Sequence, residues 1–462
     1  MSAACFAPHD PIVVTVGDSD ANDSGSDETM GSMSGPSTTT TMSSTTEPTG
    51  STDPTASTTL SSTTDTADSS SSDTDPTDSG STDDGGPLCG NNMLDGDEVC
   101  DDGNEVNGDG CNNDCIESGT LLWELVLPNN GNEYATDVAV SDDDEVAFLW
   151  HDAVGHIHTF DRDGNALDTV DGPAGVFWYS VDFFGNGDFA VSLAEDAPIE
   201  VARISAAGDE LWSSSAPGSG SLNGYAPRVA TTDADDVAFS GTANAAIWGG
   251  KFDGGGAFQW NDFEAVPDPG YAQGTGIACQ PDGTCVVAGV TDTNGNMNGA
   301  KEVFLRLLAP GGAEIWTSTF VPATGYFEGG FVTIAPMGDV GVAGCDNDGC
   351  LVLCYSSDGD HAWTYVPENL YPYGLAADVD GNFVVVGTGQ RDDFSEGVNA
   401  LIRKLDADGN ELWERSYNSS GAQGDEPRGV ATDSTGRIFV VGETEQSDGD
   451  GSYDAWIRAY AP

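Results

Sequence analysis

The sequence predicts an all-β fold: a seven-bladed β-propeller closed by an N-terminal strand and preceded by a disordered linker and a small disulfide-rich module. Two repeating patterns in residues 119–462 predict the propeller. One is a glycine turn followed by a tryptophan, and the other is a β-branched run that ends on a glycine. The closure is predicted because the last repeat lacks its tryptophan segment, and a matching segment stands at the front of the region.

Residues 1–14 form an N-terminal segment with a candidate lipidation site at Cys5. A charged start and an apolar run of about 7–15 residues, the marks of a secretory leader, are missing there. Either the chain is cytosolic or its start lies upstream, and we favour the second. The run Ser2-Ala3-Ala4-Cys5 resembles the end of a bacterial lipoprotein signal, in which small residues precede a lipid-bearing cysteine. We expect membrane contact only through such a lipid, because no segment approaches the roughly 18 apolar residues of a spanning helix.

Residues 15–88 are predicted to be a disordered linker, since they consist mainly of Ser, Thr, Asp, Gly and Pro. Such a composition cannot bury enough apolar surface to offset the entropy of ordering the chain. A flexible coil of this length spans roughly 45 Å, and repulsion between its acidic residues extends it further. We expect a stalk, either bare or glycosylated on Ser or Thr.

Residues 89–115 form a cysteine-rich segment with few apolar side chains. Disulfides must hold a segment this small and polar, and its cysteines are Cys89, Cys100, Cys111 and Cys115. Four cysteines allow three connectivities, which the sequence leaves open. Through CDDGN at 100–104 and GDGC at 108–111, the segment resembles the myxobacterial cysteine-rich repeat of secreted and surface proteins. Asn92 and Asp97 depart from the glycines usual in that repeat.

The same segment offers oxygen ligands for calcium, the only cofactor considered: Asp101, Asp102, Asn104, Asn107 and Asp109. Hard oxygen ligands in a glycine-permitted loop suit Ca²⁺. The spacing is not that of the helix-loop-helix calcium site, because no bidentate Glu stands at the twelfth position. The alternative is that these side chains cap their own backbone in Asx turns.

The glycine turn leads into a tryptophan at five places, and an imperfect copy, DRDGNALD, ends at Asp168. Successive copies lie about 44 to 56 residues apart, a period typical of propeller blades. Within each period, a hairpin of β-branched strands precedes a third strand and then the tryptophan segment, so each repeat supplies four strands. Seven such hairpins are expected, with turns near Asp143, Gly187, Asp235, Asp282, Gly338, Asp380 and Thr435.

The final repeat stops after its third strand, and TLLWELVL at 120–127 matches the missing fourth strand, with Trp123 in the place of Trp413. A first strand that completes the last blade leaves no open edge. The units resemble bacterial β-propeller repeats of the SBBP type, and DADGNELW is similar to repeats of pyrroloquinoline-quinone propellers. This resemblance implies the fold alone, because the chain lacks the adjacent cysteine pair of the quinone enzymes and has seven repeats where they usually have eight.

The remaining cysteines fit the predicted hairpins. Cys279 with Cys285 is expected to join the first two strands of the fourth blade, and Cys345 with Cys350 the second and third strands of the fifth, which leaves Cys354 free. Cysteines paired across turns indicate an oxidising compartment and therefore export. We expect a lipoprotein that is extracellular or on the outer-membrane surface.

The net charge of −65 excludes nucleic acid and anionic lipid surfaces as partners, because both would be repelled. A nucleophile elbow, a phosphate loop and a zinc-protease helix are absent from the sequence. His158 falls near a third-strand position that holds an arginine in other repeats, so we expect the histidines of WHDAVGHIHTFD to be structural. Allowing a residue of slack, the arginines at this position are Arg203, Arg306, Arg403 and Arg458.

The function expected from the sequence is that of a monomeric, surface-anchored, non-enzymatic module that binds or scaffolds an extracellular protein or a glycan. No catalytic residue is predicted. The alternative is an extracellular hydrolase or lyase with its site in the central cavity of the propeller. Carboxylates clustered with a His or Tyr at the channel mouth would favour the enzyme, and a flat, glycine-lined channel would favour binding.

Overall fold

The computed structural model describes residues 89–462, apart from position 97 and ten internal segments. These segments are 128–130, 194–197, 220–226, 267–269, 293–300, 323–326, 347–348, 390–397, 420–423 and 446–451. The predicted lipidation site and linker, within residues 1–88, lie outside the described part. Among the residues that are described, no helix is long and apolar enough to cross a membrane.

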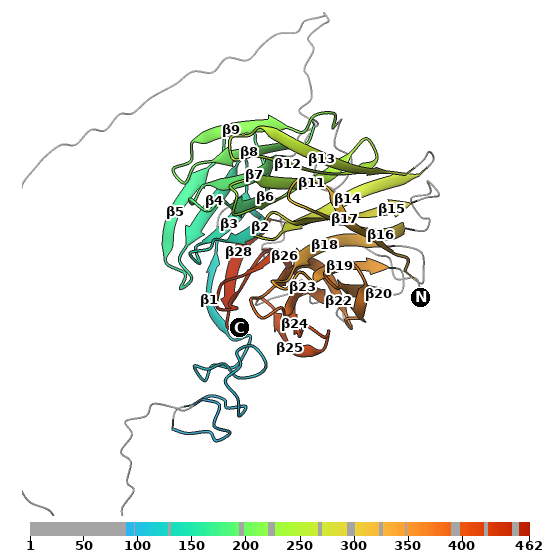
Figure 1. The fold of residues 1–462 in the computed structure, drawn as a ribbon. Helices are drawn as coiled ribbons and strands as arrows, with labels where there is room; N and C mark the ends of the chain where they lie inside the picture. The colour runs from blue at the N-terminus through green and yellow to red at the C-terminus, as the bar shows by residue number, and fades with distance from the viewer. Residues whose placement is uncertain are drawn as a thin grey trace, which may run out of the picture. The chain divides into compact units, whose positions relative to one another are not determined.

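The described chain forms seven four-stranded antiparallel sheets, which confirms the predicted seven-bladed β-propeller (Figure 1). The first blade contains β2 (Tyr134–Val140), β3 (Val146–His151), β4 (Gly155–Phe160) and β5 (Ala166–Asp171), and the second contains β6 (Trp178–Phe183), β7 (Phe189–Leu193), β8 (Glu200–Ile204) and β9 (Glu210–Ser215). The third contains β10 (Arg228–Thr231), β11 (Val237–Ala243), β12 (Ala246–Phe252) and β13 (Phe258–Ala265). The fourth contains β14 (Tyr271–Cys279), β15 (Cys285–Asp292), β16 (Lys301–Leu308) and β17 (Glu314–Phe320). The other three are β18 (Glu328–Ile334), β19 (Val340–Asp346), β20 (Gly349–Tyr355) and β21 (His361–Tyr365); β22 (Leu370–Ala377), β23 (Phe383–Gly389), β24 (Asn399–Leu405) and β25 (Glu411–Tyr417); β26 (Asp425–Thr432), β27 (Ile438–Glu445) and β28 (Tyr453–Tyr460) with β1 (Leu121–Val126).

The first strand of each blade is innermost, and these seven strands contact one another in a ring. Buried apolar side chains form seven clusters, and each cluster combines residues from two neighbouring blades. Second strands are buried on both faces, as in the all-buried VAFSGTA of β11, whereas the outer strand β13 alternates between exposed and half-buried residues. The core therefore lies between the blades, and the outer strands face solvent.

The first strand closes the ring, as predicted. In β1, Trp123 pairs with Ala459 of β28, and Val126 pairs with Trp456. Figure 1 shows β1 alongside β28, so the two ends of the propeller share one blade. This pairing satisfies the backbone groups of β28 that would otherwise form an exposed edge.

An outer-strand tryptophan joins most blades to the next one. The indole N–H of Trp212 donates to the main-chain oxygen of Gly254 at 2.9 Å, and Trp123, Trp260, Trp316 and Trp363 make the same contact with their neighbouring blades. The turn that receives Trp212 contains Gly256, with φ of +79°, and a Cβ there would lie 2.7 Å from the indole. Only glycine fits both that dihedral and that contact. The first blade has Asp168 in place of the tryptophan.

Third-strand arginines bridge several junctions. Arg306 of the fourth blade donates to Asp262 and Glu264 on the outer strand of the third blade, both at 2.8 Å. His158 occupies the equivalent position in the first blade, where it pairs with Phe148. Burial lowers the pKa of His158, and its ring lies edge-on to that of Trp150. This location fits the predicted structural role.

The expected disulfide bonds are present. Cys279 is bonded to Cys285 across β14 and β15, and Cys345 to Cys350 across β19 and β20. Cys354 is buried and is the free cysteine among the described residues. In the module, where the sequence left three connectivities open, Cys89 is bonded to Cys115 and Cys100 to Cys111.

Candidate functional site

The seven innermost strands begin at the same end of the ring, which we call the ring mouth. Six of these strands have a register shift within their first residues. Such a β-bulge bends the strand and redirects the side chain of the extra residue. The extra residues are Thr136, Tyr179, Thr275, Gly330, Tyr373 and Arg428. The bulges thus place two tyrosines and an arginine at equivalent positions of the ring.

Arg428 lies at the centre of a charged group at the ring mouth. Its guanidinium donates to Glu426 at 2.7 Å and also to Glu443, whose side chain is only 4% exposed. Burial alone would lower the pKa of Arg428, but the charges of Glu443 and Glu426 outweigh it and raise that pKa. The guanidinium also lies 5.5 Å from the centre of the Tyr373 ring, within reach of a cation–π interaction. A permanently charged cation is therefore fixed at this site.

Aromatic side chains extend this group toward the first two blades. The Tyr134 ring lies 5.3 Å from that of His151, its cross-strand partner, and 5.9 Å from that of Tyr453. The centre of the His151 ring also lies 5.2 Å from that of Phe177 and 6.2 Å from that of Tyr179. Burial lowers the pKa of His151 to about 4, so its imidazole is neutral at pH 7. These rings form a continuous aromatic surface with one neutral base.

The tyrosines of the ring mouth stay protonated at neutral pH. Burial and the charge of Glu443 raise the pKa of Tyr134. Burial, followed by Glu426, raises the pKa of Tyr453 and that of Tyr373. Their hydroxyl groups are consequently hydrogen-bond donors that can release a proton only to a group of developing negative charge.

A second acidic group lies deeper in the ring, three residues beyond Tyr179 along β6. Asp182 accepts hydrogen bonds from the main-chain N–H of Thr231 at 2.7 Å and from its hydroxyl at 3.1 Å. Burial raises the pKa of Asp182 to about 6 against these hydrogen bonds, and the charge of Asp137 adds to the increase. Asp137 in turn lies 3.5 Å from Arg228. A carboxyl group that titrates near neutral pH is suited to acid–base chemistry.

The predicted calcium ligands are close in sequence but serve different contacts. The carboxylate of Asp101 accepts main-chain N–H groups of Gly90, Asn91, Asn92 and Gly103, and these four hydrogen bonds lower its pKa although burial acts the other way. Asp102 accepts from the N–H of Cys111 at 3.0 Å, and Asn107 accepts from that of Asn113 at 2.8 Å.

Asp109 comes closest to forming a shared site with its neighbours. It accepts a hydrogen bond from the Asn104 amide at 3.1 Å, and burial together with the charge of Asp102 raises its pKa. Among the described residues, the group of three candidate ligands that do lie together is Cys89, Glu98 and Cys115, but its two sulfurs are joined in a disulfide and are not thiolates. Calcium binding by the module stays a prediction.

The ring-mouth residues were not predicted from the sequence. One signal for them exists: Thr275, Tyr373 and Arg428 each directly precede a glycine of the inner strand, Gly276, Gly374 and Gly429. Aligning the repeats on that glycine would have shown that large polar residues occupy an otherwise small position. Glu426 lies on the same strand as Arg428, but Glu443 and Tyr373 come from other strands and could not be paired with Arg428 in this way.

No family model and no curated protein matches the chain, so the resemblances of the module and of the repeats to named repeat types stay predictions. Solved propellers do match. One titled streptogramin B lyase shares 14% identity, covers 74% of this chain and all of its own length, and has a TM-score of 0.49. Virginiamycin B lyase from Staphylococcus aureus shares 16% identity over 72% of this chain and 98% of its own, with a TM-score of 0.46. The Dos1 propeller shares 11% identity over 74% of this chain and 95% of its own, with a TM-score of 0.47.

These matches correct one expectation. The expectation that the protein is not an enzyme is wrong as a deduction from the fold, because two of the matching structures named above are titled as lyases. At these identities, the likeness assigns no reaction to this chain.

Proposed function

We propose that this chain is an enzyme, a hydrolase or a lyase, that acts on an extracellular substrate at the ring mouth. One observation supports the proposal: two carboxylates, Glu426 and Glu443, gather at the ring mouth with a histidine and several tyrosines. The site therefore combines proton donors, proton acceptors and a fixed positive charge, which are the groups that acid–base bond cleavage requires.

The environment of each group suggests its role. Tyr134 and Tyr453, whose pKa values are raised, donate a proton or hydrogen bond to the oxygen of the departing group. Asp182, with a pKa of about 6, exchanges a proton with the substrate near neutral pH. Arg428 keeps its charge at all accessible pH values and stabilises negative charge that develops on the substrate.

The chemistry of the ring mouth favours a glycan as the substrate. Tyrosine and histidine rings offer flat apolar faces with polar edges, and the carboxylates and Arg428 offer acceptors and donors for hydroxyl groups. A sugar ring has the matching combination of an apolar face and a hydroxyl-rich edge.

The test is a comparison of wild-type and variant chains on a panel of bacterial and plant polysaccharides. A hydrolase generates new reducing ends, and a lyase that acts on an acidic polysaccharide generates a carbon–carbon double bond conjugated with a carboxylate, which absorbs ultraviolet light. Tyr134→Phe and Asp182→Asn should each lower the rate by about 10²–10⁴. Tyr365→Phe is the matched control, because Tyr365 lies on the outer strand β21, where its hydroxyl accepts a hydrogen bond from Arg403. Cleavage at the wild-type rate by both site variants, or tight glycan binding without cleavage, would contradict the proposal.

We also propose that the enzyme works outside the cell, attached through lipid on Cys5. The disulfides support this location, because such bonds persist in oxidising compartments. Expression of the gene with its upstream sequence in a bacterium fed a labelled fatty acid tests the anchor. Label in the wild-type chain that is lost in Cys5→Ser supports it, and equal label in both chains contradicts it.

A further inference from the structure

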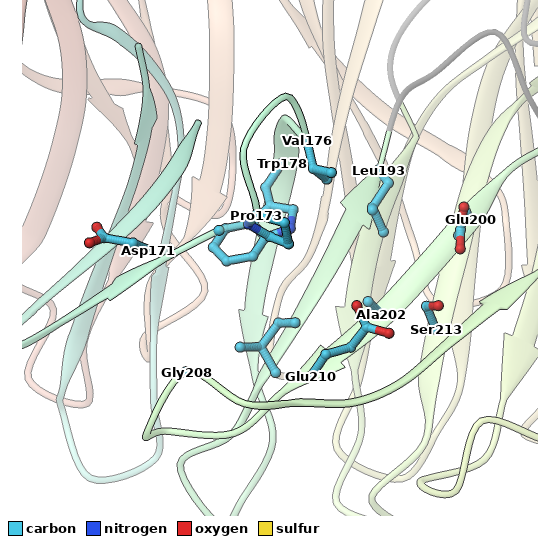
Figure 2. A pocket seen from close by; sticks show the side chains of 12 residues that line it. Asp171, Pro173, Val176, Trp178, Leu193, Glu200, Ala202, Gly208, Glu210 and Ser213 are labelled. Atoms are coloured by element: carbon cyan, nitrogen blue, oxygen red, sulfur yellow. The ribbon is translucent and has the colours of Figure 1, made fainter. Parts of the chain in front are cut away.

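A hollow of about 440 Å³ lies between the first and second blades, and none of its lining residues is among the ring-mouth residues described above. Its wall is apolar at Trp178, Val176, Leu193 and Ala202, and Glu210 of β9, the strand next to that of Ala202, also lines it (Figure 2). This volume is within the range of small-ligand clefts, roughly 300–1,000 Å³. The hollow is formed by the end of β5 and by strands β6, β7, β8 and β9.

The junction that contains the hollow lacks both side chains that fill other junctions. The first blade has Asp168 where the outer strands of the other blades have a tryptophan, so a Cβ at Gly208 in the receiving turn would meet Val170 at 3.4 Å instead of an indole. The second blade has Ala202 where three other blades have an arginine. Ala202 pairs with Val191, just as Arg306 pairs with Val287. The two positions are equivalent because each valine is the third residue of the second strand of its blade.

The arginines at the equivalent positions show what such a gap holds. Arg306 places its guanidinium against Asp262 and Glu264 of the preceding blade. Arg458 stacks on the ring of Tyr417 from the preceding blade, 3.0 Å from its centre. At the junction of the fifth and sixth blades, a smaller hollow of about 290 Å³ remains beside Arg403. An alkyl guanidinium is therefore the native filling at three of the seven junctions, since the equivalent position of the third and fifth blades holds Gly250 and Leu353.

The charge of the first hollow matches the missing group. Its lining includes Asp171, Glu200 and Glu210, and no Lys, Arg or His is among its lining residues. Asp171 contacts His156 at 2.7 Å, and within the described chain neither Glu200 nor Glu210 forms an ion pair. The next residue along β8, Arg203, points to the third blade, where it bonds Asp235. No basic group of the described residues compensates the two glutamates.

We propose that this hollow is a binding site for an alkyl guanidinium group supplied from outside the chain. The guanidinium binds the carboxylates of Glu200 and Glu210, and the alkyl stem packs on Trp178, Leu193 and Ala202. Planar guanidinium groups pair with carboxylates through two parallel hydrogen bonds, and their stems pack on apolar surface. The external group thus takes the place that Arg306 and Arg458 fill in their own junctions.

The test measures binding of the blocked tripeptide acetyl-Gly-Arg-Gly-amide to the full chain by titration calorimetry at low salt. The norleucine analogue, which keeps the stem but lacks the charge, should bind at least tenfold more weakly. Glu200→Gln/Glu210→Gln should weaken binding of the arginine peptide at least tenfold, whereas Asp142→Asn/Asp143→Asn should leave it unchanged. The control pair removes the same charge from an exposed turn, so it corrects for general attraction of cations to an acidic protein.

Ala202→Arg is the second variant, because it should restore the internal arginine and abolish binding while the chain stays folded by circular dichroism. Binding by that folded variant at wild-type strength, or an equal loss in the two charge pairs, would overturn the proposal. Propylguanidinium distinguishes the source of the group. Equal affinity for it indicates a free small guanidine, and tenfold tighter binding of the peptide indicates an arginine side chain of a protein partner.

Discussion

The indole N–H of Trp123 donates a 3.0 Å hydrogen bond to the main-chain oxygen of Arg162, 39 residues further along the chain. Trp123 belongs to the strand that closes the ring, and Arg162 to the turn between the third and fourth strands of the first blade. The same contact recurs at four other junctions. Neighbouring blades are therefore held by one aromatic side chain and one glycine turn, in addition to their shared apolar core.

Substitution of Gly256, the glycine of the turn that receives Trp212, should lower the free energy of unfolding by more than backbone strain alone would. Gly256 and Gly187 both have positive φ, so alanine at either costs about 1 kcal/mol of folding free energy. At Gly256 the added methyl must also displace Trp212, which brings the expected loss to about 3 kcal/mol. Gly187 is the matched control, since a Cβ there meets no atom within 4 Å. Urea denaturation measures the free energy of unfolding of both variants. Equal losses would contradict the proposed contact between Trp212 and the Gly256 turn.

His151 should make the fold less stable in acid. Its pKa is about 4 when folded and about 6.5 when unfolded, so the unfolded chain binds the proton more readily. The contribution of His151 to the free energy of unfolding is complete above pH 6.5 and is lost as the pH falls toward 4. The total loss is about 3 kcal/mol. His151→Gln should remove this part of the pH dependence, and the exposed His361→Gln should not. Unfolding free energies measured between pH 7 and pH 4 decide between these outcomes.

Asp182 should make the fold less stable as the pH rises, which is the opposite of the effect of His151. Its folded pKa of about 6 is above the unfolded value near 4, so its contribution is present below pH 4 and is lost as the pH rises through 6. The expected loss is about 3 kcal/mol. Asp182→Asn keeps an acceptor for the Thr231 N–H and should be more stable than wild type at pH 7 but not at pH 4. A constant difference across this range would show that burial does not raise the pKa of Asp182.

Thiol counting should report on Cys5. The chain has ten cysteines and four disulfides, which leaves Cys354 and Cys5. Burial raises the pKa of the Cys354 thiol to about 12, so it should not react in the native protein. A denatured, unreduced chain should show one reactive thiol if Cys5 carries lipid and two if it does not. Colorimetric thiol titration of protein isolated from membranes gives the count.

Calcium should bind the module weakly, if the sequence-based prediction holds. One Ca²⁺ with a Kd of roughly 10⁻⁴–10⁻³ M is expected for an extracellular site of this type. Titration calorimetry on chelator-treated protein measures it, and Asp102→Asn/Asp109→Asn should abolish the signal. Asp142→Asn/Asp143→Asn serves as the control for charge. Absence of binding would leave the turn-capping hydrogen bonds of these residues as their role.

The blades could be predicted because their signals are local. A glycine turn, a β-branched run and a tryptophan recur in each unit, and each depends on residues only a few positions apart. The closure could be predicted because the last unit visibly lacks a strand. The ring mouth could not, since Tyr134, Arg428 and Tyr453 come from opposite ends of the propeller region. Their meeting depends on bulges in the main-chain register, which no single residue type marks.

The pairing of β1 with β28 makes the two ends of the propeller depend on each other. A ribosome releases Trp123 long before Trp456 is made, so an emerging polypeptide holds β1 without its partner strand until β28 has appeared. Assembly of the final sheet must therefore wait until β28 has left the ribosome, and the other six sheets can form before it.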